Sequence, residues 1–240
     1  MVFLLLAFVA AAIFVRLGIW QLHRLHERRE RNALVMSRLD SAVVDVGELP
    51  RDSALARFRR VRISGVPDYG HELIYAARGY NGSPGVELLT PVRRAGQNTA
   101  VLVDRGWVYS PDGATVDLSR WHDRDSVFTG FAEEFPSVKG RTYSTRPNVI
   151  ARLSYDVVAK ALPYPILPIY VVMLSDSTVA PTRVARLSVP PLDEGPHLSY
   201  AIQWFAFAVV ALVGAGIAVR QWRRDDRSSL TVDAPWPPNR

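Results

Sequence analysis

The stretch VFLLLAFVAAAIFVRLGIW, residues 2 to 20, contains a single charged residue, Arg16. A second apolar stretch, YAIQWFAFAVVALVGAGIAV, occupies residues 200 to 219. About 20 apolar residues in a helix are enough to cross the hydrocarbon core of a bilayer. The first stretch continues into Trp20 and a charged sequence, and it lacks the small-residue cleavage site of a signal peptide. The sequence therefore predicts two membrane-spanning helices.

Arginines beside the two spans bear on the topology. Four follow the second span: Arg220, Arg223, Arg224 and Arg227. The positive-inside rule places that end in the cytoplasm, so the N-terminus is expected there too and the middle of the chain outside. Four others, however, follow the first span: Arg24, Arg28, Arg29 and Arg31. A basic leader missing from this sequence would resolve the disagreement, and the opposite topology stays open.

These spans divide the chain into four regions. We expect transmembrane helix 1 at residues 1–22, an extracytoplasmic stalk and β-rich domain at 23–198, transmembrane helix 2 at 199–219 and a basic cytoplasmic tail at 220–240. Helical spacing of apolar residues from Arg24 to Leu39 predicts that the first helix continues as a stalk. The proline-rich tail from Ser228 is expected to be disordered.

The middle region has the pattern of a sheet. β-rich runs occupy residues 59–65, 71–78, 86–92, 99–108, 126–131 and 167–174. Turn signals separate several of them, among them Asn81-Gly82 and Pro111-Asp112-Gly113. Ser154 is placed to cap a short helix that ends at Ala161. The fold class expected is an α+β membrane protein, with two transmembrane helices flanking a mainly antiparallel β domain or partial barrel.

Composition excludes several classes of function. The chain has 240 residues and a net charge of +6, but its arginines lie beside the spans or among acids, unlike the basic face of a nucleic-acid-binding protein. The absence of cysteine excludes disulfides, thiolate metal sites and cysteine nucleophiles. No G-x-S-x-G, P-loop or G-x-G-x-x-G motif is present. Because nothing supplies a reaction centre, we do not expect an enzyme.

Four motifs carry a family resemblance. They are LGIWQLHR at residues 17–24, FRRV at 58–61 with Gly65 after it, LVDRGWV at 102–108 and GPHLSYAIQW at 195–204. In this order, between two flanking spans, they resemble the surfeit locus protein 1 family of cytochrome c oxidase assembly factors, in a bacterial form of the actinobacterial type. Asp104 departs from the pattern, because many relatives carry asparagine there.

The resemblance implies a role in maturing subunit I of an aa3-type cytochrome c oxidase in the plasma membrane, through the handling of haem a. It also implies that His197 and Trp204, at the start of the second span, contribute to haem binding, with His197 as a ligand of the haem iron. The expected partners are subunit I, other oxidase subunits and membrane lipid. The alternative is a scaffold or accessory subunit that binds the oxidase and never binds haem.

Helical geometry adds two hypotheses about the site. His197 and Trp204 are seven residues apart and so point within about 20° of each other, with Tyr200 and Ala201 flanking the same stripe. Arg16, Trp20 and His23 share a face of the first helix. One hypothesis is that this face meets the His197 stripe and that Arg16 or Arg24 pairs with a haem propionate. The alternative is that Arg16 reaches the lipid headgroups.

Overall fold

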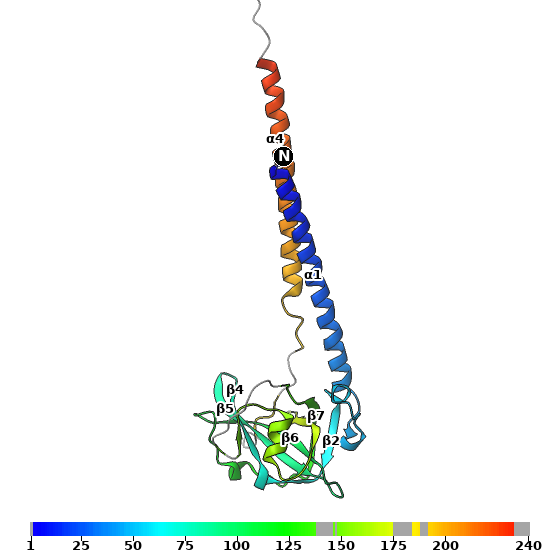
Figure 1. The fold of residues 1–240 in the computed structure, drawn as a ribbon, viewed down its shortest axis with the longest axis vertical. Helices are drawn as coiled ribbons and strands as arrows, with labels where there is room; N and C mark the ends of the chain where they lie inside the picture. Colours follow the sequence, from blue (N-terminus) through cyan, green and yellow to red (C-terminus); the bar gives the residue numbers. More distant parts are fainter. Residues whose placement is uncertain (1, 138–145, 147, 175–183, 188–191, 233–240) are drawn as a thin grey trace, which may run out of the picture. The chain divides into compact units, whose positions relative to one another are not determined.

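The computed structural model describes residues 2–137, 146, 148–174, 184–187 and 192–232, with the side chains of 225–232 left out. The chain forms two compact units. One, the helical unit, comprises residues 1–33 and 192–240; the other, the sheet domain, comprises residues 34–191. Figure 1 shows both, and each is described by itself.

Two long helices make up most of the helical unit, α1 (Val2–Leu39) and α4 (His197–Val232). Both are long and apolar enough to cross a membrane, as predicted. The continuation of α1 through the stalk is also confirmed, since one unbroken helix reaches Leu39. The prediction of disorder from Ser228 is wrong as far as Val232, because α4 continues to that residue. Residues 233–240, the rest of that prediction, lie outside the described residues.

The sheet domain is built on nine strands. They are β1 (Val44–Asp45), β2 (Arg60–Ser64), β3 (Val66–Pro67), β4 (Leu73–Tyr80), β5 (Ser83–Arg93), β6 (Ala100–Tyr109), β7 (Val127–Glu134), β8 (Val149–Ile150) and β9 (Ile166–Met173). The order is β1-β2-β7-β9-β6-β5-β4-β8, with β3 beside β5. Five of the eight pairings are antiparallel, so the predicted class is confirmed. The short elements are η1 (Val46–Glu48), α2 (Ser53–Ala56), η2 (Tyr69–His71), η3 (Leu118–Trp121) and α3 (Tyr155–Ala161).

Local signals placed several of these elements correctly. Asn81 and Gly82, with φ of 50° and 78°, form the two-residue turn between β4 and β5, where Tyr80 pairs with Ser83. The Ser154 side chain accepts from the backbone N–H of Val157 and caps α3 as expected. The parallel pairing of β6 with β9 was not predicted, because residues 110–165 separate the two strands in the chain.

Strand β6 lies inside the sheet and is buried on both faces. Val101 and Val103 point into one apolar cluster with strands β2, β7 and β9. Leu102 points into a second cluster, which Val158 of α3 covers on the other face. The central strand of such a sheet is therefore a near-continuous apolar run, which matches the residues from Ala100 to Val103.

Asp104 continues β6 as a buried carboxyl group with 2% of its surface exposed. Its Oδ1 accepts from the backbone N–H of Gly106 at 2.9 Å. Burial raises the pKa of Asp104 well above its usual range, and the nearby Glu87 carboxylate raises this pKa further. The folded domain thus binds a proton at Asp104 more tightly than the unfolded chain does.

We expect Asp104→Asn to stabilise the protein at neutral pH and to reduce the pH dependence of its stability. A raised carboxyl pKa contributes stability below the unfolded value of about 4, and this contribution is lost as pH rises through the folded pKa. Asparagine keeps an acceptor for the Gly106 N–H and cannot ionise. The free energy of unfolding, measured between pH 4 and 8, should fall less steeply in the variant. Identical slopes would contradict this assignment.

Candidate functional site

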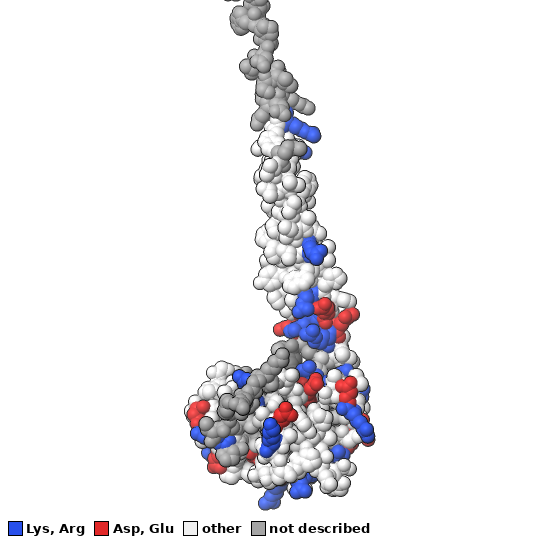
Figure 2. All heavy atoms as spheres, viewed as in Figure 1, with Lys and Arg blue, Asp and Glu red and all other residues white. Residues whose placement is uncertain are grey.

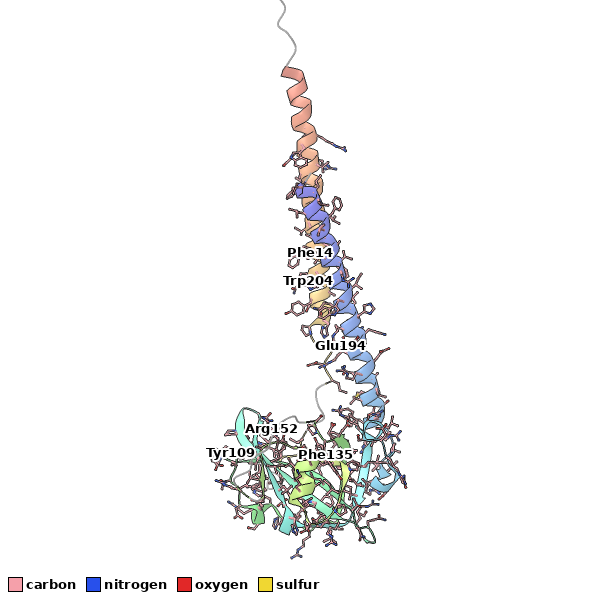
Figure 3. The ribbon with its side chains drawn as sticks, in the orientation of Figure 1. Phe14, Tyr109, Phe135, Arg152, Glu194 and Trp204 are labelled. Atoms are coloured by element: carbon pink, nitrogen blue, oxygen red, sulfur yellow. The ribbon has the colours of Figure 1, made fainter. Side chains whose placement is uncertain are left out.

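One face of α1 packs against α4. Ala11 and Leu25 on this face are each 4% exposed, and Gly18 between them is buried. Gly18 permits the close approach, since a Cβ atom there would lie 2.7 Å from the ring of Phe205. Phe14 stacks on Trp204, with ring centroids 5.8 Å apart and an interplanar angle of 24° (Figure 3). Contacts of Phe14 with residues 204 and 207, and of Gln21 with residue 197, make the two helices antiparallel.

The facing surface of α4 is the predicted His197 stripe. Ala201, Ala208 and Ala215 on it are at most 4% exposed. These small residues let the helix backbones approach closely, as they do in many membrane helix pairs. The stripe therefore packs against α1, and its first residue, His197, carries a polar imidazole into the contact.

His197 is held by a residue that sequence reasoning did not single out. Its Nδ1 lies 2.8 Å from Oε1 of Gln21, within hydrogen-bond distance. An amide oxygen only accepts, so this contact assigns the proton to Nδ1 and leaves the lone pair on Nε2. Gln21 lies within the motif LGIWQLHR, seven residues after Phe14 and three after Gly18. Residues at these spacings share one face of a helix, so the spacing was the sequence signal that Gln21 faces α4.

The segment that leads into α4 is fastened to α1 by ion pairs. Arg29 makes a bidentate pair with Glu194, with both N···O distances 2.8 Å. Arg28 pairs with Asp193 at 3.2 Å, and Asn32 donates to the carbonyl of Leu192 at 2.9 Å. In Figure 2 acidic and basic side chains gather together at one end of the helix pair, while only isolated basic side chains are seen farther along it. Gly195, with a φ of +68°, then turns the chain into α4 beside the His197 ring.

These contacts fit an imidazole ligand for haem iron. A metal-binding histidine usually donates its other ring N–H to an oxygen, which fixes its orientation and tautomer. The Nδ1 contact with Gln21 provides this arrangement, and Nε2 is the nitrogen that would hold the iron. Trp204 fits the predicted role less well, because Phe14 already occupies one face of its ring.

The other predicted site residues do not join His197. Tyr200 is 46% exposed. Arg24 pairs with Glu27 on its own helix at 2.7 Å. The hypothesis that the Arg16 face meets the His197 stripe is wrong: Arg16 and Trp20 each lie two residues from Gly18, about 200° around the helix, and are exposed on the side away from α4. The pairing of Arg16 or Arg24 with a haem propionate stays a prediction.

The RGW motif forms a buried polar cluster in the sheet domain. The guanidinium of Arg105, 1% exposed, donates to Glu72 Oε1 at 3.0 Å and to Asp123 Oδ2 at 2.8 Å, and it also reaches the carbonyl of Trp121. Thr90 donates to the same Glu72 oxygen. His122 Nε2 lies 3.3 Å from the second oxygen of Glu72. We call this set of residues the Arg105 cluster; it joins β6 to η2 and to the loop after η3.

Gly106 and Trp107 continue the motif at the end of the domain. Gly106 has a φ of +117°, and a side chain there would collide with the Ala185 carbonyl. Trp107 exchanges backbone hydrogen bonds with Ala185 at 2.8 and 3.0 Å. A glycine at residue 106 therefore allows the close backbone approach to Ala185. The indole of Trp107 is half-buried: it covers Gly85 and donates to the carbonyl of Arg78 at 3.0 Å.

Comparison with known proteins covers both units. The SURF1 family model matches residues 8–209. An uncharacterised SURF1-like protein of Mycobacterium tuberculosis is 30% identical over 236 residues, which is 92% of this chain and 85% of that protein. A SURF1-like protein of Rickettsia felis is 26% identical over 217 residues, and the match covers 87% of this chain and 93% of the Rickettsia protein. The mycobacterial relative agrees with the actinobacterial form that the motifs indicated. This chain belongs to the SURF1 family, which is known as a family of cytochrome oxidase assembly factors.

Proposed function

We propose that this protein helps to assemble an aa3-type cytochrome c oxidase in the plasma membrane by holding haem a and passing it to subunit I. The observation that carries the proposal is the contact between His197 Nδ1 and Gln21 Oε1, which leaves Nε2 as a metal ligand. The membership of a family of assembly factors, in which nothing points to catalysis, supports a carrier and not an enzyme.

In this proposal the residues of the helix pair bind and orient the cofactor. His197 would hold the haem iron through its imidazole, and Gln21 would keep the imidazole proton on Nδ1. The ion pairs of Arg28 and Arg29 with Asp193 and Glu194 position the start of α4 and therefore the imidazole. Haem a, when bound, supplies the iron centre that the oxidase requires. Both termini are proposed to lie in the cytoplasm and the sheet domain outside.

The alternative is a scaffold that binds oxidase subunits without haem. A specific observation favours it: the face of α4 that carries His197 is already covered by α1, since Ala201 and Ala208 are buried there and Trp204 stacks on Phe14. A macrocycle beside His197 would then have to approach from the end of the helix pair. The two functions differ in whether the purified protein carries haem.

His197→Ala is expected to abolish the haem a absorption band of protein purified in detergent after co-expression with the haem a biosynthetic enzymes. Gln21→Leu should reduce haem retention by about tenfold or more, because loss of a partner that orients a ligand typically costs 10–100-fold in metal affinity. Gln21→Glu, which keeps an acceptor, should restore it. Tyr200→Phe, exposed on the same turn, is the matched control and should retain the band.

The outcomes separate the two functions. A band that His197→Ala loses and Tyr200→Phe keeps supports the carrier. Absence of haem from the wild-type protein, with oxidase activity still dependent on the chain, would eliminate the carrier and leave the scaffold. Haem that survives in His197→Ala would show that another residue supplies the ligand.

A further inference from the structure

The side of α1 that faces away from α4 bears a shallow hollow. It has a volume of about 580 Å³ and is lined by Ile13, Arg16, Leu17, Ile19, Trp20 and His23. Trp20 and Ile13 are 52% and 51% exposed, so the hollow is open to whatever surrounds the helix. All six residues belong to one helix, and over a rise of 1.5 Å per residue they extend along about 15 Å of it.

A charge in this hollow has no counter-ion within the described chain. Of the cations on α1 in the helical unit, Arg24, Arg28 and Arg29 are each paired with a carboxylate. Arg16 has no hydrogen bond or ion pair among the described residues, and neither predicted span contains an aspartate or glutamate to supply one. An unpaired charge within a membrane span is costly, so this level of the span favours an anion supplied from outside the chain.

The chemistry of the hollow indicates which anion. Three polar groups line it: the guanidinium of Arg16, the indole N–H of Trp20 and the imidazole of His23. The guanidinium and the indole can only donate hydrogen bonds. Such a set suits phosphate oxygens, which only accept, and guanidinium–phosphate contacts are among the stronger hydrogen bonds. The lining residue deepest in the span is the apolar Ile13, and the outermost is His23. A phospholipid has the same order, with its acyl chains inward and its phosphate near the tryptophan level.

We propose that this hollow binds one anionic phospholipid, with the phosphate on Arg16 between Trp20 and His23 and an acyl chain along Ile13 and Leu17. A partner helix fits less well, because it would cover more of α1 than the short hollow provides. The lipid would hold α1 at a fixed depth, and the opposite face would remain free to position His197. This inference does not depend on whether the protein binds haem.

Arg16→Gln tests the proposal, because it removes the charge and keeps a flexible polar side chain. The full-length protein, delipidated in detergent, is titrated with dioleoyl phosphatidylglycerol and separately with dioleoyl phosphatidylcholine, and bound lipid is counted by native mass spectrometry. The wild type should bind one phosphatidylglycerol in preference to phosphatidylcholine. Arg16→Gln should weaken phosphatidylglycerol binding by about tenfold or more, the loss expected for a charged hydrogen bond.

Arg31→Gln is the matched control. Arg31 is an exposed arginine of the same helix, outside the hollow, and its loss should leave the affinity unchanged. Equal affinity of the wild type for the two lipids, or equal affinities of Arg16→Gln and Arg31→Gln for phosphatidylglycerol, would overturn the proposal. Unchanged lipid binding by Arg16→Gln with loss of co-purifying oxidase would also overturn it and assign Arg16 to a carboxylate on a partner protein.

Discussion

Arg105→Ala is expected to destabilise the sheet domain by about 3–5 kcal/mol, the usual cost of breaking a buried ion pair by removing one partner. Arg105 is 1% exposed and Glu72 is 2% exposed, so neither group can recover its interactions with water. Removal of the guanidinium leaves the Glu72 carboxylate in the core, with Thr90 and His122 as its remaining contacts. It also releases the carbonyl of Trp121 and frees the loop after η3 from β6.

Urea unfolding of the full chain in detergent, followed by tryptophan fluorescence, measures this effect. Arg62→Ala is the matched control: Arg62 is exposed on β2, and its loss should change the free energy of unfolding by less than about 0.5 kcal/mol. The double variant Glu72→Gln with Arg105→Met should regain part of the stability lost by Arg105→Met alone, because no buried carboxylate is then left unpaired at residue 72. Equal losses for Arg105→Ala and Arg62→Ala would show that the Arg105 cluster does not stabilise the fold.

Gly106→Ala is expected to cost about 3 kcal/mol or more, from two physical causes. A backbone φ of +117° is open to glycine and costs any other residue about 1–3 kcal/mol. The added methyl group would also overlap the Ala185 carbonyl, which cannot move away while Trp107 and Ala185 exchange backbone hydrogen bonds. The segment from Val184 to Leu187 must then leave β6.

Gly82→Ala separates the two causes. Gly82 also has a positive φ, +78°, but a Cβ atom there meets nothing within 4 Å, so the variant should lose only about 1–2 kcal/mol. Hydrogen exchange at the amides of Trp107 and Ala185 should accelerate in Gly106→Ala and stay unchanged in Gly82→Ala. If the two variants lost the same stability and exchanged alike, the contact with Ala185 would play no part.

The parts of this protein that sequence predicted rest on short-range physics. Two apolar runs of bilayer length predicted α1 and α4, because a helix satisfies its own backbone hydrogen bonds in lipid. Asn81-Gly82 predicted the β4–β5 turn because both residues adopt a positive φ readily. The four motifs identified the family and directed attention to His197, since they are read directly from residue types and order.

The sequence did not predict correctly which face of α1 packs against α4. A span in lipid is apolar all round, so its pattern does not distinguish the side that meets lipid from the side that meets a second helix. The choice of the Arg16 face for contact with His197 was therefore wrong. Gly18 and Gln21 determine which face of α1 meets α4. Gly18 leaves room for the ring of Phe205, and the amide of Gln21 contacts His197.

Residue types and their order were enough to predict two apolar helices, a β-rich domain between them and the family to which the chain belongs. Tertiary structure alone decided that Gln21 orients His197, that Arg16 faces away from it and that Arg105 is buried. Arginine is seldom buried unless paired, and the partners of Arg105, at residues 72 and 123, are 33 and 18 residues away. Contacts between residues so far apart depend on strand pairing and helix packing, which local patterns of residues do not specify.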